Sequence, residues 1–186
     1  MIASEIYVND SLELVHPNVE RDAQISLSWL KASKIRPLMR LMNVRIDDNY
    51  QPNITDEIAR ITNFIERQDQ IVWMIKRSNA VIGSIWADIV RTDHLEPPVV
   101  CLMLGNENSR QSGVGKLATT GVLNFLSGEG YEKAYAGAVL VNNTPAINML
   151  NSLNYQKFGV PRLNEENEFI QDFVVDLSNS DLRSSK

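Results

Sequence analysis

Residues 108–116 read Asn-Ser-Arg-Gln-Ser-Gly-Val-Gly-Lys and lead directly into an apolar periodic run that ends at Phe125. Apolar or small residues recur in this run at steps of three and four, which predicts a helix with one stripe against a sheet. Glycines at the start of a helix let backbone N–H groups approach an anion at the positive end of the helix dipole. The stretch therefore predicts a phosphate-binding turn followed by a core helix. The stripe consists of Val114, Leu117, Ala118, Gly121, Val122 and Phe125.

This turn lacks the pattern of either common nucleotide-binding loop. A nucleotide-hydrolysing P-loop needs glycine where Arg110 stands and a magnesium-binding hydroxyl where Leu117 stands. A dinucleotide-binding fold needs its glycines directly after a strand and an acid at the end of the next strand. Here the apolar run 99–104 stops well before the glycines, and no acid closes the next strand candidate, 134–141. We therefore expect neither nucleotide hydrolysis nor a nicotinamide cofactor.

Composition limits the class of protein. The chain has 186 residues, 44% of them hydrophobic, and no Pro-, Gly- or Ser-rich linker divides it, so we expect one domain over 1–177 and a polar tail over 178–186. No apolar run is long enough for an export signal or a membrane span, so we expect a cytoplasmic protein that does not bind membranes. The net charge of −5 disfavours contact with the phosphate backbone, so we expect no binding of nucleic acid. Cys101 is the only cysteine, and His16 and His94 stand apart, so we expect no disulfide and no metal.

Hydrophobic periodicity predicts an α+β fold, with a mixed, mainly antiparallel sheet flanked by helices. The runs 71–76 and 81–90 should form an antiparallel hairpin, because Arg77-Ser-Asn-Ala80 makes a tight connection between them. The runs 156–160 and 169–177 should form a second hairpin at the end of the chain. The other expected elements are strands at 12–16, 99–104 and 134–141, helices at 19–30, 36–42, 58–65 and 114–125, and a short helix after 144.

Capping residues mark three of the helix starts. Asn18 directly precedes the first helical run, and either Asn53 or Thr55 can cap the third. Thr144 is the expected cap of the last helix. Pro145 would then take the first helical position, where its missing N–H has no helical partner in any case.

Two separated motifs, together with this order of elements, resemble the GNAT superfamily of N-acetyltransferases, which use acetyl-coenzyme A. The pyrophosphate motif of that family, Gln/Arg-x-x-Gly-x-Gly/Ala, is matched by Arg110-Gln-Ser-Gly113-Val-Gly115. The second motif, an Asn with an Ala three residues later and a Leu-Gly-Phe-like end, is matched by Asn143-Thr-Pro-Ala146 and Leu153-Asn-Tyr155. The resemblance covers nearly the whole chain. It is closest to the branch that contains ribosomal-protein N-terminal acetyltransferases and some aminoglycoside acetyltransferases.

The resemblance implies roles for the residues in and around both motifs. Acetyl-CoA would be the cosubstrate, with its pyrophosphate on the backbone N–H groups of the turn and its pantetheine arm between the strands 99–104 and 134–141. A backbone N–H near Leu104 would polarise the thioester carbonyl and stabilise the oxyanion. Asn143 would approach the cofactor from the second motif. The residues implied in cofactor binding are Leu102, Met103, Leu104, Arg110, Gln111, Ser112, Gly113, Val114, Gly115, Lys116, Asn143 and Ala146.

The chain departs from the family pattern at the catalytic base and acid. Many relatives carry a Glu on the strand before the turn, but 99–104 contains no carboxylate and no His. Many also carry a Tyr in the helix of the second motif, where Leu150 stands here, and Tyr155 at the family's Phe position is interpreted as a core aromatic. Among carboxylates that border the acceptor side in the resembling fold, Asp88 is the first candidate base and Glu107 the second. The others are Asp47, Asp48 and Glu96.

These departures favour an acceptor amine that loses its proton easily. A lysine-type amine with a pKa near 10.4 is neutral about one time in 2,500 at pH 7, whereas an α-amine with a pKa near 8 is neutral roughly one time in 10. A missing base therefore slows the first amine far more than the second. We expect the acceptor to be a protein or peptide N-terminus, or an amine-bearing small molecule such as an amino sugar.

The predicted function is direct attack of a neutral primary amine on the thioester of acetyl-CoA, without a covalent acyl-enzyme. Two alternatives stay open. One is a catalytically degenerate GNAT domain that binds acetyl-CoA as a sensing or scaffolding module, and the other is a different acyl donor. The sequence also leaves open whether the chain forms a homodimer.

Overall fold

The computed structural model describes residues 4–31, 39, 50–92 and 94–178. Except for Met39, the predicted helix at 36–42 lies outside the described residues, as do the candidate acids Asp47 and Asp48 and, except for Ser178, the predicted tail. In the described part of the chain, no helix combines the length and the apolar character needed to cross a membrane.

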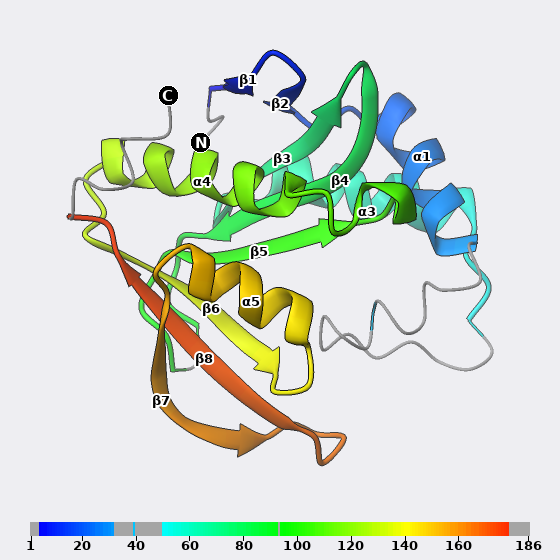
Figure 1. Cartoon of the computed structure of the whole chain (residues 1–186). Helices are drawn as coiled ribbons and strands as arrows, with labels where there is room; N and C mark the ends of the chain where they lie inside the picture. The colour runs from blue at the N-terminus through cyan, green and yellow to red at the C-terminus, as the bar shows by residue number, and fades with distance from the viewer. Residues whose placement is uncertain (1–3, 32–38, 40–49, 93, 179–186) are drawn as a thin grey trace.

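Eight strands form one sheet in the order β1-β2-β3-β4-β5-β6-β8-β7, and all neighbours are antiparallel except β5 and β6. This confirms the predicted mixed, mainly antiparallel sheet flanked by helices (Figure 1). The strands are β1 (Ile6–Asn9), β2 (Leu12–Val15), β3 (Gln70–Arg77), β4 (Ala80–Asp88), β5 (Val99–Leu104), β6 (Lys133–Leu140), β7 (Gln156–Leu163) and β8 (Phe169–Asp176). The helices are α1 (Val19–Lys31), α3 (Ile54–Glu66), α4 (Val114–Gly128) and α5 (Thr144–Ser152), with a 3₁₀ turn, η1 (Glu107–Ser109).

The hairpins follow from local turn chemistry. Ser78 and Asn79 connect β3 to β4, and both have positive φ, 47° and 69°, which matches the twist of the paired strands. The first strand, β1, was not predicted from the sequence. It pairs with β2 through a short turn in which Ser11 N–H donates to Asn9 Oδ1 over 3.0 Å. Its four residues are too few to show a clear alternation, so periodicity alone could not reveal it.

Two of the three predicted helix starts are confirmed. Asn18 Oδ1 accepts a hydrogen bond from Arg21 N–H over 2.9 Å, and Asn53, not Thr55, accepts one from Asp56 N–H over 3.0 Å. The predicted cap of α5 is wrong, because Asn143 takes that position and its Oδ1 accepts from Ala146 N–H over 3.3 Å. The amide oxygen of Asn143 reaches the first-turn N–H, so Thr144 already belongs to the helix.

Successive side chains along each strand face opposite sides of the sheet, and each side has its own core. One side, which we call the α4 face, packs Trp73, Ile85 and Val100 against α4 and α5, which lie in front of the sheet in Figure 1. The other side, the α1 face, packs Met74 and Met103 with Trp29 of α1. On that face the rings of Phe64 from α3 and Trp86 from β4 lie 5.9 Å apart. Each face therefore carries its own helical layer.

Candidate functional site

β5 and β6 lie side by side at the middle of the sheet but pair at a single register position, Val99 with Tyr135. Tyr135 N–H donates to the carbonyl of Pro98 over 2.9 Å at this point. Beyond it the two strands diverge (Figure 1). We call the diverging parts, 100–104 and 136–140, the split. Its two edges carry backbone groups that have no ladder partner across the split.

The edge of β5 that faces the split is defined by alternation along the strand. Because the carbonyl of Pro98 points toward β6, the backbone groups of Leu102 and Leu104 point the same way, while those of Cys101 and Met103 pair with β4. The carbonyl of Leu104 accepts a hydrogen bond from Arg110 Nε over 3.1 Å. The N–H groups of Leu102 and Leu104 are thus aligned along the split, at the positions where the sequence predicted thioester contacts.

The predicted phosphate turn lies directly beyond the end of β5. Gly113 is the N-cap residue of α4, with a φ of 80° that favours glycine, and it makes no side-chain cap hydrogen bond. The first helical hydrogen bond runs from Leu117 N–H to Gly113 O over 3.1 Å. The N–H groups of Val114, Gly115 and Lys116 precede it and have no carbonyl one turn back to bind. The start of α4 is therefore an uncapped cluster of donors at the positive end of the helix.

Gly115 lets this turn approach the split closely. A Cβ at that position would lie 3.1 Å from Leu102 Cδ2 and 3.2 Å from Met149 Sδ, so a larger residue would have to displace the ends of these two side chains. The second glycine of the motif thus allows close packing, whereas Gly113 is favoured by its backbone conformation. Both glycines place the donors of the turn next to the end of β5.

Three cations surround the turn. Arg110 donates from Nε to Leu104 O and from Nη2 to Gly105 O, over 3.1 and 3.3 Å, so its guanidinium lies at the end of β5. Lys116 is exposed in the first turn of α4. Arg77, at the end of β3, donates from Nη1 to Ser112 Oγ over 3.4 Å. Arg77 was not predicted from the sequence, because only the tertiary fold brings the β3–β4 hairpin to the turn.

The second motif lies at the other side of the split. Asn143 and Ala146 stand at the start of α5, just after β6 ends, and the amide oxygen of Asn143 binds Ala146 N–H. α4 and α5 contact each other on the α4 face of the sheet. The structure therefore brings both predicted motifs to the two sides of one split.

The two predicted base candidates lie at opposite ends of β5. Asp88 is the last residue of β4 and stands opposite Val99, while Glu107 belongs to η1, beyond Leu104. Burial raises the pKa of Asp88. The positive charge of Arg67 lowers this pKa, whereas the negative charge of Asp69 raises it further. The structure does not bring Asp88 and Glu107 together, so they cannot act as one acid–base pair.

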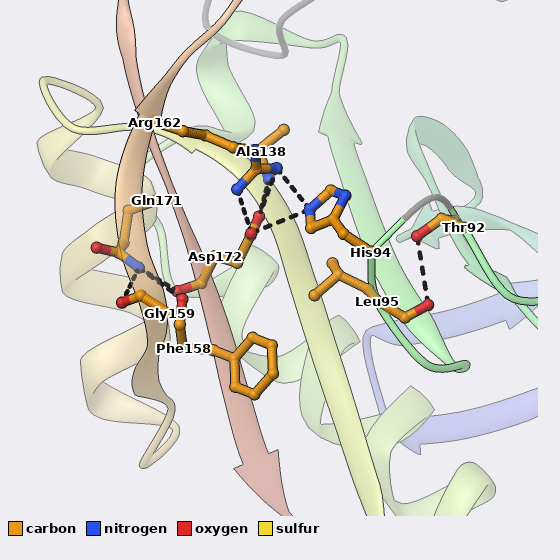
Figure 2. A network of polar contacts seen from close by, with 9 residues as sticks. All are labelled: Thr92, His94, Leu95, Ala138, Phe158, Gly159, Arg162, Gln171 and Asp172. Atoms are coloured by element: carbon orange, nitrogen blue, oxygen red, sulfur yellow. Dashed lines mark hydrogen bonds and ion pairs between the residues drawn. The ribbon is translucent and has the colours of Figure 1, made fainter.

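A polar network that the sequence analysis missed lies on β8 and the β4–β5 loop (Figure 2). The carboxylate of Asp172, only 3% exposed, accepts hydrogen bonds from Ala138 N–H over 2.7 Å and from Arg162, and it lies 3.0 Å from His94 Nε2. Burial alone would raise the pKa of Asp172, but the bonds from Arg162 and Ala138 N–H and the charges of Arg162 and His94 lower it overall. Asp172 is thus held as a carboxylate against a left-handed bulge at Ala138, whose φ is 54°.

The single cysteine and a buried tyrosine lie near the base of the split. Burial raises the pKa of the Cys101 thiol to about 12, so the thiolate that a covalent acyl-enzyme would need is strongly disfavoured at neutral pH. Tyr155 is 2% exposed, and within the described ranges its hydroxyl has no hydrogen-bond partner. Among the residues described, no group of three His, Cys, Asp or Glu side chains could hold a metal ion.

Comparisons with known proteins identify relatives of the whole fold. A family model described as "Acetyltransferase (GNAT) family" matches residues 38–155. A search of curated proteins finds no match. Among solved structures, the microcin C7 self-immunity acetyltransferase MccE, in complex with acetyl-CoA and AMP, is 16% identical, with a TM-score of 0.74 over 91% of this chain and 94% of that one.

Two further structures are ribosomal-protein acetyltransferases. RimL, the ribosomal L7/L12 α-N-protein acetyltransferase, in complex with coenzyme A, is 13% identical, with a TM-score of 0.74 over 93% of this chain and 98% of that one. An acetyltransferase from Salmonella typhimurium that modifies the N-terminal serine of L7/L12 is also 13% identical, with a TM-score of 0.73 over 93% and 99%. At these identities the structural likeness establishes a shared fold.

Proposed function

Because this chain belongs to the acetyltransferase (GNAT) family, we propose that it transfers an acetyl group from acetyl-CoA to a primary amine. The observation that carries the proposal is the uncapped start of α4 next to the free edge of β5. A pyrophosphate on the N–H groups of Val114, Gly115 and Lys116 would leave a pantetheine arm within reach of the split. The structural neighbours solved with acetyl-CoA and with coenzyme A support this donor.

The cations around the turn would complete the phosphate site. Arg77 and Lys116 are proposed to bind phosphate oxygens directly, since a guanidinium and an ammonium are both suited to phosphate. Arg110 already binds two backbone carbonyls at the end of β5, so its proposed share is to fix the turn against the strand as well as to add positive charge. Asn143 and Ala146 are proposed to border the cofactor from α5.

In the proposed reaction the amine attacks the thioester carbonyl directly. The N–H groups of Leu102 and Leu104 face the split and can stabilise the oxyanion that develops on the carbonyl oxygen. The raised pKa of Cys101 supports direct attack over a cysteine acyl-enzyme. Among the predicted carboxylates, Asp88 and Glu107 are proposed to help remove the proton of the amine.

The proposed acceptor is a protein or peptide N-terminal α-amine, or the amine of an amino sugar. The pKa argument favours such amines, because they are neutral about 250 times more often than a lysine side chain at pH 7. Two neighbours named as acetyltransferases of ribosomal L7/L12 N-termini support the first class.

The test is coenzyme A binding by calorimetry, followed by an acceptor screen with thiol release as the signal. The panel should contain peptides with a free N-terminus and no lysine, acetyl-capped peptides with one lysine, aminoglycosides and polyamines. We expect CoA binding, and thiol release with the peptides that have a free N-terminus or with the aminoglycosides. Binding without acceptor-dependent thiol release would instead favour a sensing or scaffolding module, and no CoA binding would refute the donor site.

A matched pair of variants tests the turn itself. Gly113→Asp places a carboxylate at the uncapped start of α4, where it repels a phosphate, whereas Gly113→Asn has nearly the same shape and no charge. Both variants place a side chain at the left-handed φ of 80°, so the strain of that conformation is common to the pair. The space around Gly113 is open, since a Cβ there would meet no heavy atom within 4 Å. We expect the CoA dissociation constant to rise at least about tenfold more in Gly113→Asp than in Gly113→Asn, a difference of about 1.4 kcal/mol. Equal affinities would contradict phosphate binding at this turn.

A further inference from the structure

One extra residue lies in β6 where this strand borders the split. β6 pairs with β8 at Ala136 and again at Val139, three residues later, but the two partners on β8 are only two residues apart. Ala136 and Val139 both pack on the α4 face, whereas strict alternation would place them on opposite faces. β6 therefore contains a β-bulge at Gly137 and Ala138, just beyond its pairing with β5.

The bulge identifies the strand that opens the split. β5 pairs with β4 at every position from Val99 to Leu104, with no shift of register. A bulge, in contrast, bends its strand and increases the local twist. The bulge follows closely on Tyr135, the residue of β6 that pairs with β5. The split therefore opens because β6 turns away from a regular β5, and the position of the bulge sets where it opens.

The backbone of the bulge is strained at Ala138. Its φ of 54° lies in the left-handed region, which costs an L residue with a Cβ a factor of about five to thirty in population. Such strain persists only where the surrounding structure enforces it, and it is typical of functional sites. Ala138 lies in a strand, whereas the other non-glycine residues of positive φ in the described ranges lie in turns or bends. They are Ser78, Asn79, Gln111, Asn154 and Asn167.

The buried carboxylate of Asp172 holds this strained residue, and Figure 2 shows it pointing at Ala138 from β8. Its Oδ1 accepts the Ala138 N–H over 2.7 Å and lies 3.8 Å from the place where a Cβ of Gly137 would stand. Arg162 of β7 donates to the same carboxylate, with Nη2 3.2 Å from Oδ1. Burial raises the pKa of Asp172, but the bonds from Arg162 and Ala138 N–H lower it overall. The acceptor is therefore charged at neutral pH, which strengthens its bond to the bulge.

The bulge leaves two backbone donors of β5 free. A regular β6 would continue beside β5 and bind the N–H groups of Leu102 and Leu104. We propose that Asp172 is a positioning residue of the donor site: its carboxylate holds the bulge at Ala138, and the bulge keeps the edge of β5 free for the pantetheine arm. This inference rests on the proposed function, since the free edge has a use only when a donor occupies the split.

Coenzyme A binding, measured by calorimetry, tests this role with a matched control on the same strand. Asp172→Ala removes the acceptor of the Ala138 N–H, and the dissociation constant should rise about tenfold or more, because a hydrogen bond to a charged group is lost from the bulge. Gln171→Ala removes an equally buried side chain, whose Nε2 donates to Phe158 O over 2.8 Å, toward β7. It should lower stability but keep the affinity within about twofold of wild type, since the bulge is intact.

Substitutions of Ala138 test whether Asp172 acts through the bulge. Glycine adopts a φ of 54° without the Cβ penalty, so Ala138→Gly in the Asp172→Ala background should recover about fivefold or more of the lost affinity. Ala138→Val should weaken CoA binding although Asp172 is intact, because a β-branched residue is a genuine outlier at positive φ. The valine variant also keeps the inference testable if Asp172→Ala does not fold.

Amide hydrogen exchange without ligand reports on the split itself. In the wild type, the N–H groups of Leu102 and Leu104 should exchange faster than the β5 amides that bind β4. In Asp172→Ala this difference should shrink about fivefold or more, because β6 closes on the free edge. Gln171→Ala should keep the difference. A loss of global stability alone would not produce this result, since the compared amides belong to one strand.

Each result decides for or against the role of Asp172. Unchanged affinity and exchange in a folded Asp172→Ala would overturn the inference, as would an equal loss of affinity in Gln171→Ala or no recovery in the double variant. The proposed function would survive these results, because the wild type would still bind CoA. No CoA binding by the wild type would overturn the proposed function and the use of the free edge with it. The exchange difference would then still show whether Asp172 holds the bulge.

Discussion

At the scale of single residues, the fold shifts the pKa values of Asp69 and Asp88 in opposite directions, although the charge of Arg67 acts on both. Arg67 binds Asp69 through two hydrogen bonds of 2.7 Å and lowers its pKa, whereas burial raises the pKa of Asp88. A raised folded-state pKa means that the folded state holds its proton more tightly than the unfolded chain. Stability then falls as pH rises from the ordinary value of 3.8 through the raised pKa.

We therefore expect Asp88→Asn to raise the melting temperature at pH 7, with the gain vanishing below pH 3.8, where both states of the wild type are protonated. Asp69→Asn should do the opposite, because its lowered pKa stabilises the fold above pH 3.8 and that stabilisation is lost as pH falls through the folded pKa. Melting curves of both variants between pH 3 and pH 8 check this pair. A lower melting temperature of Asp88→Asn at pH 7 would show that the Arg67 charge outweighs burial.

At the scale of elements, the start of α3 is decided by one side chain. Asn53 Oδ1 accepts from Asp56 N–H over 3.0 Å, and Asn53 Nδ2 also donates to the Asp56 carboxylate over 2.7 Å. Asn53→Ala should lower the free energy of unfolding by about 1 kcal/mol, while Thr55→Ala, at an exposed position inside the helix, should change it by less than about 0.5 kcal/mol. Urea unfolding of both variants measures the difference, and equal losses would contradict the assignment of the cap.

The elements also show which parts of this molecule local sequence could predict. β5 has the predicted bounds, Val99–Leu104, because six apolar residues between turn signals admit few other structures. The turn before α4 was recognised because its glycines are a local requirement. The network of His94 and Asp172 was missed, since the two residues lie 78 positions apart and meet only through the pairing of β6 with β8 and the path of one loop. Arg77 was missed for the same reason.

At the scale of the whole molecule, one pairing position joins the two parts of the sheet. β1 to β5 form a continuous antiparallel part, β6, β8 and β7 form another, and Val99 with Tyr135 is the register position at which they meet. The two cores on the α4 and α1 faces keep the parts together by packing, while the backbone along the split stays free for a ligand. The donor would therefore complete the sheet at its centre.

Amide hydrogen exchange tests this view of the sheet. Without ligand, the N–H groups of Leu102 and Leu104 should exchange faster than those of Cys101 and Met103, which bind β4 across a regular ladder. Coenzyme A at about 100 times its dissociation constant should slow Leu102 and Leu104 by about tenfold or more, because bound ligand adds up to about 2.7 kcal/mol to the liganded state. The exchange rates of the α3 amides, which are remote from the split, should fall only as far as the ligand raises the global free energy of unfolding. Equal protection of all four β5 amides before ligand addition would mean that the edge facing β6 is already satisfied, and the pantetheine would then need another path.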